Sequence, residues 1–222
     1  MTTEQYLTFQ KFTDKASALE LADLLKQNYI DCKFEDTSGR VDLTFSNSEA
    51  IKEYRVKLRK ENFEAANNLL LQLTAQQLEN VSKEYYLYEF SDEELTEIIH
   101  KPDEWCKLDY LLAQKLLKDR GREITPELAE TYKKQRIQEL SEPERSQKGW
   151  IIAGYIFSFL GGLLGVFIGW HLRYHKKTLP NGDRVFAYSI PDRKNGYNIF
   201  IIGIISFVCW LIVRILSGPY LW

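Results

Sequence analysis

Residues that carry most catalytic and metal chemistry are scarce in this chain. Its 222 residues include three histidines and three cysteines. The sequence has no phosphate-binding loop, no dinucleotide-binding glycine fingerprint, no nucleophile elbow and no HExxH helix. We therefore predict that the protein is not an enzyme and that it binds no cofactor and no metal ion.

Paired cysteines and a leader segment are missing as well. Cys32, Cys106 and Cys209 are widely spaced and form no CxxC motif, which argues against a disulfide framework. Free thiols are typical of a reducing compartment. The first residues, MTTEQYLTFQKF, have neither the basic nor the apolar region of a secretion signal, so we expect no signal peptide.

An excess of positive charge is also lacking, which argues against nucleic acid as a partner. The net charge is −2, but it is unevenly distributed. Residues 1–149 carry 29 acidic and 22 basic side chains, a net of −7, whereas residues 150–222 carry 2 acidic and 7 basic side chains, a net of +5. The basic part can contact lipid headgroups.

Two long apolar runs contrast with this polar background. Residues 150–170 read WIIAGYIFSFLGGLLGVFIGW and residues 197–213 read YNIFIIGIISFVCWLIV, and neither contains a charged side chain. Because about 20 apolar residues cross the hydrocarbon core of a bilayer, we predict two spans, 150–170 and 197–216, with Arg214 snorkelling. Residues 149–222 would then form a two-helix transmembrane hairpin, with both chain ends on one side of the membrane.

The first 90 residues alternate between strand and helix patterns. Strand patterns cover residues 6–12, 30–34, 54–59 and the aromatic stretch 85–90, and amphipathic helix patterns cover residues 16–25 and 62–73. This order predicts an α+β fold, with a ferredoxin-like βαββαβ domain over residues 1–90. Residues 41–53 would fit either one extra strand, with residues 41–45 as the candidate, or a short helical insertion.

Residues 91–148 have helical patterns and predict a small helical module followed by a spacer. A capping box at Ser91–Glu94 begins the first helix, a second helix follows residue 103, and a third, mostly charged helix begins at residue 125. Trp105 lies between the first two helices, where it is either part of a core or an exposed binding anchor.

The stretches LTFQKF, ALELADLLKQNYIDCKFED and EYRVKLRKENFEAANNLL resemble a family of prokaryotic signal-transducing proteins, small ferredoxin-like domains likened to PII signalling proteins. Family members often have glycine where this chain has Asn28 and Tyr29. The segment YYLYEFSDEELTEIIHKPDEWCKLDYLLAQKLLKDRG is similar to the helical appendage of Bacteroidota members, and GGLLG and KKTLPNGDRVFAYS are similar to their membrane part. The resemblance implies a bacterial, membrane-bound signalling protein and brings no catalytic motif.

Small side chains follow the apolar runs at helical spacing. In lipid, such residues let two helix backbones approach closely. We predict helix packing at Gly154, Ser158, Gly161, Gly162, Gly165, Gly169, Gly203 and Ser206. Packing of the two spans against each other is the simplest interpretation, and a homodimer or a pore lined by this face are the alternatives.

Aromatic and basic residues flank both runs, as is typical of membrane interfaces. We assign this role to Trp150, Trp170, His171, Arg173, His175, Lys176, Lys177, Arg193, Lys194, Tyr197 and Arg214. The i, i+4 spacing of His171 and His175 would also suit a metal ion. No acidic or thiol ligand is near them in the sequence, and the neighbouring cations would repel a metal, so we favour contact with lipid phosphates.

Together these features predict a membrane-anchored, non-enzymatic signalling or adaptor protein of the cell (inner) membrane. Its soluble domain would bind a protein partner or a small ligand. Basic residues near the spans divide six against six, so the positive-inside rule gives no orientation. The lack of a signal peptide and the free thiols favour a cytoplasmic N-terminal domain. The alternative function is a membrane structural or assembly factor that works through its glycine-rich hairpin.

Overall fold

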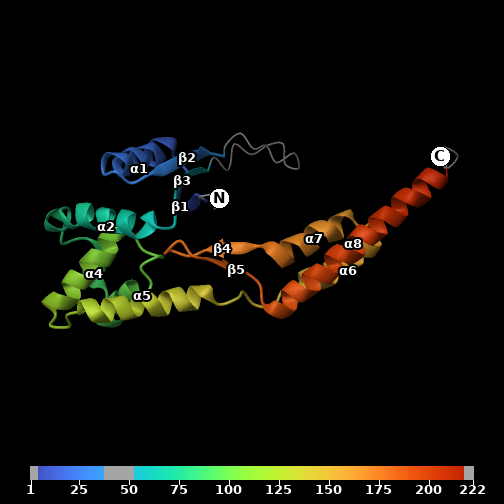
Figure 1. Cartoon of the computed structure of the whole chain (residues 1–222). Helices are drawn as coiled ribbons and strands as arrows, with labels where there is room; N and C mark the ends of the chain where they lie inside the picture. Colours follow the sequence, from blue (N-terminus) through green and yellow to red (C-terminus); the bar gives the residue numbers. More distant parts are fainter. Residues whose placement is uncertain (1–4, 38–52, 218–222) are drawn as a thin grey trace. The chain divides into compact units, whose positions relative to one another are not determined.

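The computed structural model describes residues 5–37 and 53–217, and the candidate extra strand at residues 41–45 lies outside them. The fold is a mixed α+β arrangement that divides into two compact units (Figure 1). We call Met1–Leu140 together with Thr178–Asp183 the N-terminal unit. Ser141–Lys177 together with Arg184–Trp222 form the C-terminal unit. The N-terminal unit thus includes a short segment from far along the chain.

Three strands of the N-terminal unit form an antiparallel sheet. β1 (Leu7–Phe12) and β2 (Cys32–Asp36) both pair with β3 (Tyr54–Leu58), which lies between them. The connection from β1 to β2 is α1 (Lys15–Gln27). A helix that joins two parallel strands across an antiparallel central strand is the split βαβ arrangement.

Each end of α1 is closed by a recognisable cap. At its start, the Asp14 carboxylate accepts a hydrogen bond from the Ser17 N–H at 2.8 Å. At its end, Tyr29 has a left-handed φ of 60°. The N–H groups of Tyr29 and Ile30 donate to carbonyls in the last turn of the helix at 3.0 and 2.9 Å, which is a Schellman motif built without the usual glycine.

The alternating pattern of β3 buries one face of the sheet under α1 and α2 (Asn62–Ala75). Val56 and Leu58 are fully buried, while Lys57 between them forms an ion pair with Glu35 at 2.7 Å. The helices supply the rest of this core with Ala18, Leu21, Ala22, Leu25, Phe63 and Ala66. Period-two burial explains why the sequence pattern located this strand.

The predicted fourth strand at residues 85–90 is wrong. Tyr86–Glu89 is a 3₁₀ helix, η2, and Leu87 within it is fully buried in the helical part of the unit. The Tyr85 hydroxyl donates to the buried Asp109 carboxylate at 2.8 Å. The aromatic stretch therefore packs on helices, and among the described residues no strand pairs with the outer edge of β1. A complete ferredoxin-like fold is not confirmed.

Three helices and two 3₁₀ turns build the second half of the N-terminal unit. They are η1 (Leu78–Asn80), η2, α3 (Asp92–His100), α4 (Lys107–Asp119) and α5 (Pro126–Ser141). The predicted capping box is confirmed, because the Ser91 hydroxyl accepts from the Glu94 N–H and the Glu94 carboxylate accepts from the Ser91 N–H. Their common core consists of Leu87, Leu95, Ile98, Ile99, Leu112, Ala113, Leu116 and Leu117. Trp105 packs edge-on against Phe90 at this core.

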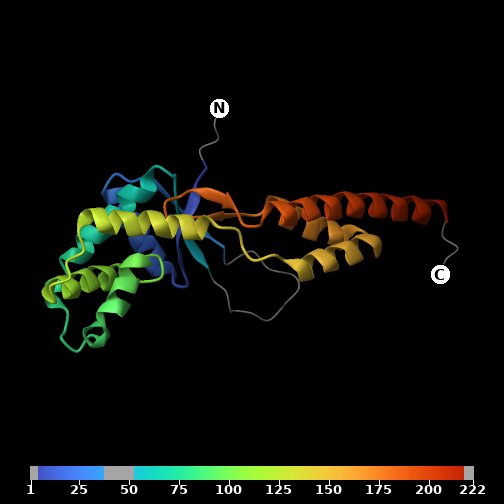
Figure 2. The ribbon, with the colours of Figure 1, turned by 90° about the horizontal axis from the view of Figure 1, so that it is seen from below.

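The C-terminal unit contains three apolar helices: α6 (Lys148–Phe159), α7 (Leu163–Tyr174) and α8 (Ile190–Leu216). In both ribbon views α6 and α7 lie alongside α8 (Figure 2), and all three pack against one another. Between α7 and α8, β4 (Lys176–Thr178) and β5 (Arg184–Phe186) form the small hairpin that the Asn181-Gly182 turn predicts. Gly182 adopts the left-handed φ of 81° that this turn needs.

The predicted first span, residues 150–170, is not a single helix. It breaks at Leu160–Gly162, where Gly161 and Gly162 have φ values of 128° and 80°. Glycine reaches such angles without the Cβ clash that other residues suffer, so the chain reverses and α7 runs antiparallel to α6 (Figure 2). Each helix has 12 residues, or about 18 Å, against about 30 Å of hydrocarbon.

The two-span hairpin is therefore not confirmed. Among the residues that the structure describes, α8 is the one helix that is long and apolar enough to cross a membrane. It includes the predicted second span and begins seven residues earlier, at Ile190. Run length alone suggested a first span, because it did not reveal that two adjacent glycines in the middle would turn the backbone.

Candidate functional site

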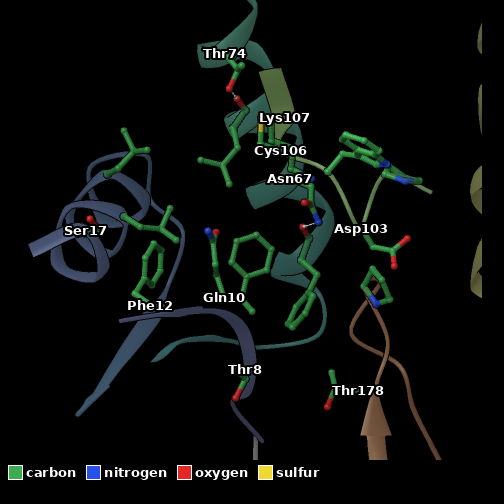
Figure 3. Close-up of a pocket in the computed structure, with 18 of the residues that line it drawn as sticks. Thr8, Gln10, Phe12, Ser17, Asn67, Thr74, Asp103, Cys106, Lys107 and Thr178 are labelled. Carbon is green, nitrogen blue, oxygen red and sulfur yellow. Dashed lines mark hydrogen bonds between the residues drawn. The ribbon is translucent and has the colours of Figure 1, made fainter. Parts of the chain in front are cut away.

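A cavity of about 730 Å³ lies in the N-terminal unit beside the outer strand β1 (Figure 3). Its walls come from β1, α1, α2, the start of α4 and the segment Thr178–Pro180. The volume is within the range of small-molecule sites, which are commonly 300–1,000 Å³. The cavity is therefore the main candidate site of this unit.

About half of the residues that line the cavity are apolar, and four of them are aromatic. β1 contributes Phe9 and Phe12, α2 contributes Phe63 and Leu70, and Trp105 closes the wall from the helical part. Phe9 and Phe63 meet edge to face, with ring centroids 5.3 Å apart. Such a wall favours an apolar or aromatic ligand surface.

Polar and charged side chains make up nearly all of the other half of the wall. One N–H of the Asn67 amide donates to the Phe63 carbonyl at 2.9 Å, and the Thr74 hydroxyl donates to the Leu70 carbonyl at 2.7 Å. Asn67 keeps its carbonyl oxygen and its second N–H for a ligand. Gln10 projects from β1 into the same space (Figure 3).

Two side chains on the cavity wall, Lys107 and Cys106, are nucleophiles when they lose their proton, and their pKa values are shifted in ways that act oppositely on this chemistry. Burial, and then the nearby Lys133 ammonium, lower the pKa of Lys107 from its usual value, and Asp103 partly opposes this effect. Burial and a hydrogen bond to Asp109 at 3.0 Å raise the pKa of the Cys106 thiol, so the thiol stays protonated at neutral pH and is a weak nucleophile.

A second cavity of about 720 Å³ adjoins the first between α2, α4 and α5. The two share Asn67, Pro102, Asp103, Lys107 and Pro180 in their walls. The second has a more charged lining, but its Arg136 guanidinium already pairs with Asp103 at 2.8 Å and with Glu104 at 2.5 Å. Because that cation is already paired, the first cavity, with its four aromatic side chains, is the better candidate for a ligand.

The segment Thr178–Asp183, which connects α7 to α8, is built into the wall of the N-terminal unit. Leu179 is only 4% exposed, and Asp183 forms an ion pair with Lys60 on the body of the unit. A Cβ on Gly182 would lie 3.2 Å from the Phe63 ring and from the Lys60 side chain. A ligand in the cavity would therefore touch the connection between two apolar helices.

The predicted helix-packing residues lie mostly at contacts inside the C-terminal unit. A Cβ added to Gly154 would meet Ile199 at 2.9 Å, one on Gly162 would meet the Gly203 carbonyl at 2.2 Å, and one on Gly169 would meet the Phe200 N at 2.5 Å. A Cβ on Gly165 would lie 2.1 Å from the Ser158 Oγ. Gly161 has no such neighbour and acts in the turn, and Ser206 is partly exposed.

Ser158 joins α6 to α8 by a hydrogen bond. It is fully buried, and its hydroxyl lies 2.8 Å from the Gly154 carbonyl and 3.0 Å from the Ile199 carbonyl. One hydroxyl proton can be shared between these two acceptors. The face of small residues is thus occupied within one chain.

The sequence analysis missed Asp192, which clamps the start of α6 to the start of α8. Its carboxylate is 3% exposed and accepts hydrogen bonds from the Ser146 hydroxyl at 3.0 Å and the Gln147 N–H at 3.3 Å. The sequence does contain a signal for this helix start, because Ser189 followed three residues later by Asp192 is a capping pattern. It marks the observed beginning of α8 at Ile190.

Several predicted interface residues lie where the three apolar helices begin or end. Trp150 and Trp170 are more than half exposed. His171 and His175 stack 4.5 Å apart, and the Tyr188 hydroxyl lies 3.0 Å from His171 Nε2. Within the described part of the chain, no group of three metal-ligating side chains forms around them.

Cations at these helix ends contact aromatic rings. The Arg193 guanidinium lies 3.3 Å from the centre of the Phe186 ring, and Lys176 Nζ lies 4.7 Å from the same ring. Arg173 lies 5.6 Å from the centre of the Tyr197 ring. Lys177 donates to the Glu142 carbonyl at 2.6 Å, while Lys194 and Arg214 belong to α8 itself.

Comparison of this chain with family models, with curated proteins and with solved structures finds no match. The resemblance to prokaryotic signal-transducing proteins is therefore still a prediction that rests on the quoted stretches.

Proposed function

We propose that this protein is a membrane-anchored, non-catalytic adaptor whose N-terminal unit binds a small, largely apolar ligand. The observation that carries the proposal is the pairing in one chain of an aromatic-lined cavity with an exposed apolar helix. Its role would be in signalling, as the family resemblance implies. The split βαβ sheet would belong to an incomplete ferredoxin-like domain.

Support for membrane anchoring comes from the side chains along α8. Ile205, Trp210 and Val213 are all more than half exposed, and α8 has no charged side chain between Lys194 and Arg214. Exposure of so much apolar surface to water is costly, at about 25 cal/mol for each Å². A bilayer removes that cost, so α8 is best explained as a membrane span.

Support for ligand binding comes from the lining of the first cavity. Its aromatic wall offers contact area, while Asn67 and Gln10 offer a few hydrogen-bonding groups. Polar groups placed among aromatic side chains can orient a ligand while the rings supply contact area. The protonated thiol of Cys106 and the ion-paired Asp103 favour binding over catalysis.

A membrane assembly factor is the second candidate function. The close contacts at Gly154, Gly165 and Gly169 make the three apolar helices a tightly packed element, which would suit a structural role in the membrane. In that case the N-terminal unit would regulate the helices, and the cavity would have no occupant of its own.

Native mass spectrometry of the full chain, released gently from membranes, separates the two functions. We expect the wild-type chain to carry a bound small molecule. The Leu70→Trp variant should lose this molecule, because the larger indole side chain fills part of the cavity. The control Leu128→Trp lies on α5 outside that wall and should keep the bound mass. A wild-type chain without any bound molecule would favour the assembly factor, and a chain that alkaline carbonate strips from membranes would contradict anchoring.

A further inference from the structure

The turn between α6 and α7 lies at the middle of the apolar part of α8. Residues 195–213 of α8 lie between Lys194 and Arg214 and contain no charge. At 1.5 Å for each residue they extend about 28 Å, close to the 30 Å of a hydrocarbon core. Gly162 packs on Gly203 and Phe207, near the centre of this stretch. Beyond that point α8 continues without α6 or α7 beside it (Figure 2).

The polar backbone of this turn has partners within the chain. The Leu160 N–H donates to the Ile156 carbonyl at 3.1 Å, the Gly162 N–H to the Phe157 carbonyl at 3.2 Å, and the Leu163 N–H to the Gly161 carbonyl at 3.0 Å. Irregular backbone at membrane depth is tolerated only where protein satisfies it. These three N–H groups meet that requirement, and Gly162 packs against α8.

Both outer ends of the pair α6–α7 are tied to the N-terminal unit. The chain leaves this unit at Leu140 and reaches the start of α6 within eight residues. It returns after α7 through residues 175–177, and Thr178–Asp183 then belong to the N-terminal unit, with Leu179 buried and Asp183 paired to Lys60. A first span that crossed the membrane would put this segment on the opposite side from the unit that it helps to build.

We infer that α6 and α7 form a re-entrant hairpin, which enters and leaves the bilayer on the side of the N-terminal unit, and that α8 alone crosses. The inference rests on the membrane anchoring proposed above. It places the end of α8 on the opposite side from the N-terminal unit, whereas a two-span hairpin would place both on one side.

Compared with a two-span hairpin, this topology distributes the basic residues unequally between the two sides of the membrane. All eleven lysines and arginines between residues 133 and 194 lie on the side of the N-terminal unit, and Arg214 alone lies beyond the span. Such an asymmetry orients a membrane protein with its basic side in the cytoplasm. The cationic ends of the hairpin then face the cytoplasmic leaflet, which is rich in anionic lipid.

Cysteine labelling in intact cells of a bacterial expression host tests the topology. In a full chain with Cys32→Ala, Cys106→Ser and Cys209→Ala, single cysteines are introduced as Glu84→Cys in the N-terminal unit, Lys176→Cys after α7 and Ser217→Cys after α8. A membrane-impermeant maleimide should label only the Ser217→Cys chain in intact cells. The other two should gain at least tenfold in labelling after the cells are opened.

Each other pattern has a defined meaning. If Glu84→Cys and Ser217→Cys behave alike and Lys176→Cys behaves oppositely, the protein has two spans and the re-entrant hairpin is wrong. If carbonate releases the protein from membranes, the anchoring itself is wrong. If the cysteine replacements prevent folding, trypsin digestion of the unmodified chain in oriented vesicles makes the same distinction, because the basic loop and the N-terminal unit should be cut from the same side.

Discussion

Replacing Gly165 by alanine should loosen the packing of α6 against α7. An added Cβ would lie 2.1 Å from the Ser158 Oγ, 2.6 Å from the Ser158 Cα and 2.7 Å from the Ser158 N. Backbone atoms cannot rotate away as a side chain can, so the two helices have to separate. Overpacking of this kind costs about 1–3 kcal/mol.

A second glycine supplies the control for this experiment. Gly149 is also within α6, but a Cβ there would meet nothing within 4 Å. Gly149→Ala should therefore show only the helix preference of alanine, a gain of up to about 1 kcal/mol. Alanine's helix preference applies to both variants, so at about 2–4 °C for each kcal/mol in a chain of this size they should differ in Tm by roughly 2–12 °C.

Thermal unfolding of the full chain in mild detergent measures this difference. The double variant Gly165→Ala with Ser158→Gly removes the hydroxyl but keeps the contact with the Ser158 Cα, so it should stay destabilised. Equal Tm values for Gly165→Ala and Gly149→Ala would refute the close approach of α6 and α7.

Three further predictions concern the N-terminal unit. Tyr29→Gly should raise its stability by about 0.5 kcal/mol, because the left-handed φ of 60° costs tyrosine more than glycine; a loss measured in urea unfolding would contradict this. For Asp103, burial raises the pKa, but hydrogen bonds from Arg136 outweigh it and hold the pKa below its usual value. The stability from this pair is therefore complete above about pH 4 and lost as the pH falls through the lowered pKa. Arg136→Gln should destabilise the protein at pH 7 and less so at pH 3, and an equal effect at both would count against the pair. The thiol of Cys106, with its raised pKa, should be alkylated by iodoacetamide at pH 8 more slowly than a small free thiol; an equal or faster rate would show that Asp109 does not hold the proton.

Local sequence patterns correctly predicted the elements that are stabilised by nearby residues or by the burial of one face of a strand. β3 alternates apolar and charged residues, and burial follows that alternation at Val56 and Leu58. The capping box at Ser91 and the turn at Gly182 also formed where the sequence placed them. For the capping box and the turn, the neighbours that matter are within a few residues.

The aromatic stretch at residues 85–90 shows where local patterns fail. Aromatic residues favour strands in general, yet Leu87 is buried among α3 and α4 and Tyr85 bonds to Asp109. Only the position of α4, 20 residues further on, makes the 3₁₀ conformation favourable. The wall of the candidate cavity has the same origin, because β1, α2 and Thr178–Pro180 meet only in the folded chain.

The sequence by itself determined that this protein has an acidic, mixed α+β part and two charge-free apolar runs, because composition and periodicity are properties of the chain. It could not determine whether the first run forms one long helix or two short ones, since its apolar length is the same in both cases. Tertiary structure decided that point. Gly161 and Gly162 reverse the chain because α8 offers Gly203 as a surface close enough for the turn to pack on, and the segment Thr178–Asp183 returns to the N-terminal unit because Lys60 and Phe63 are there to hold it.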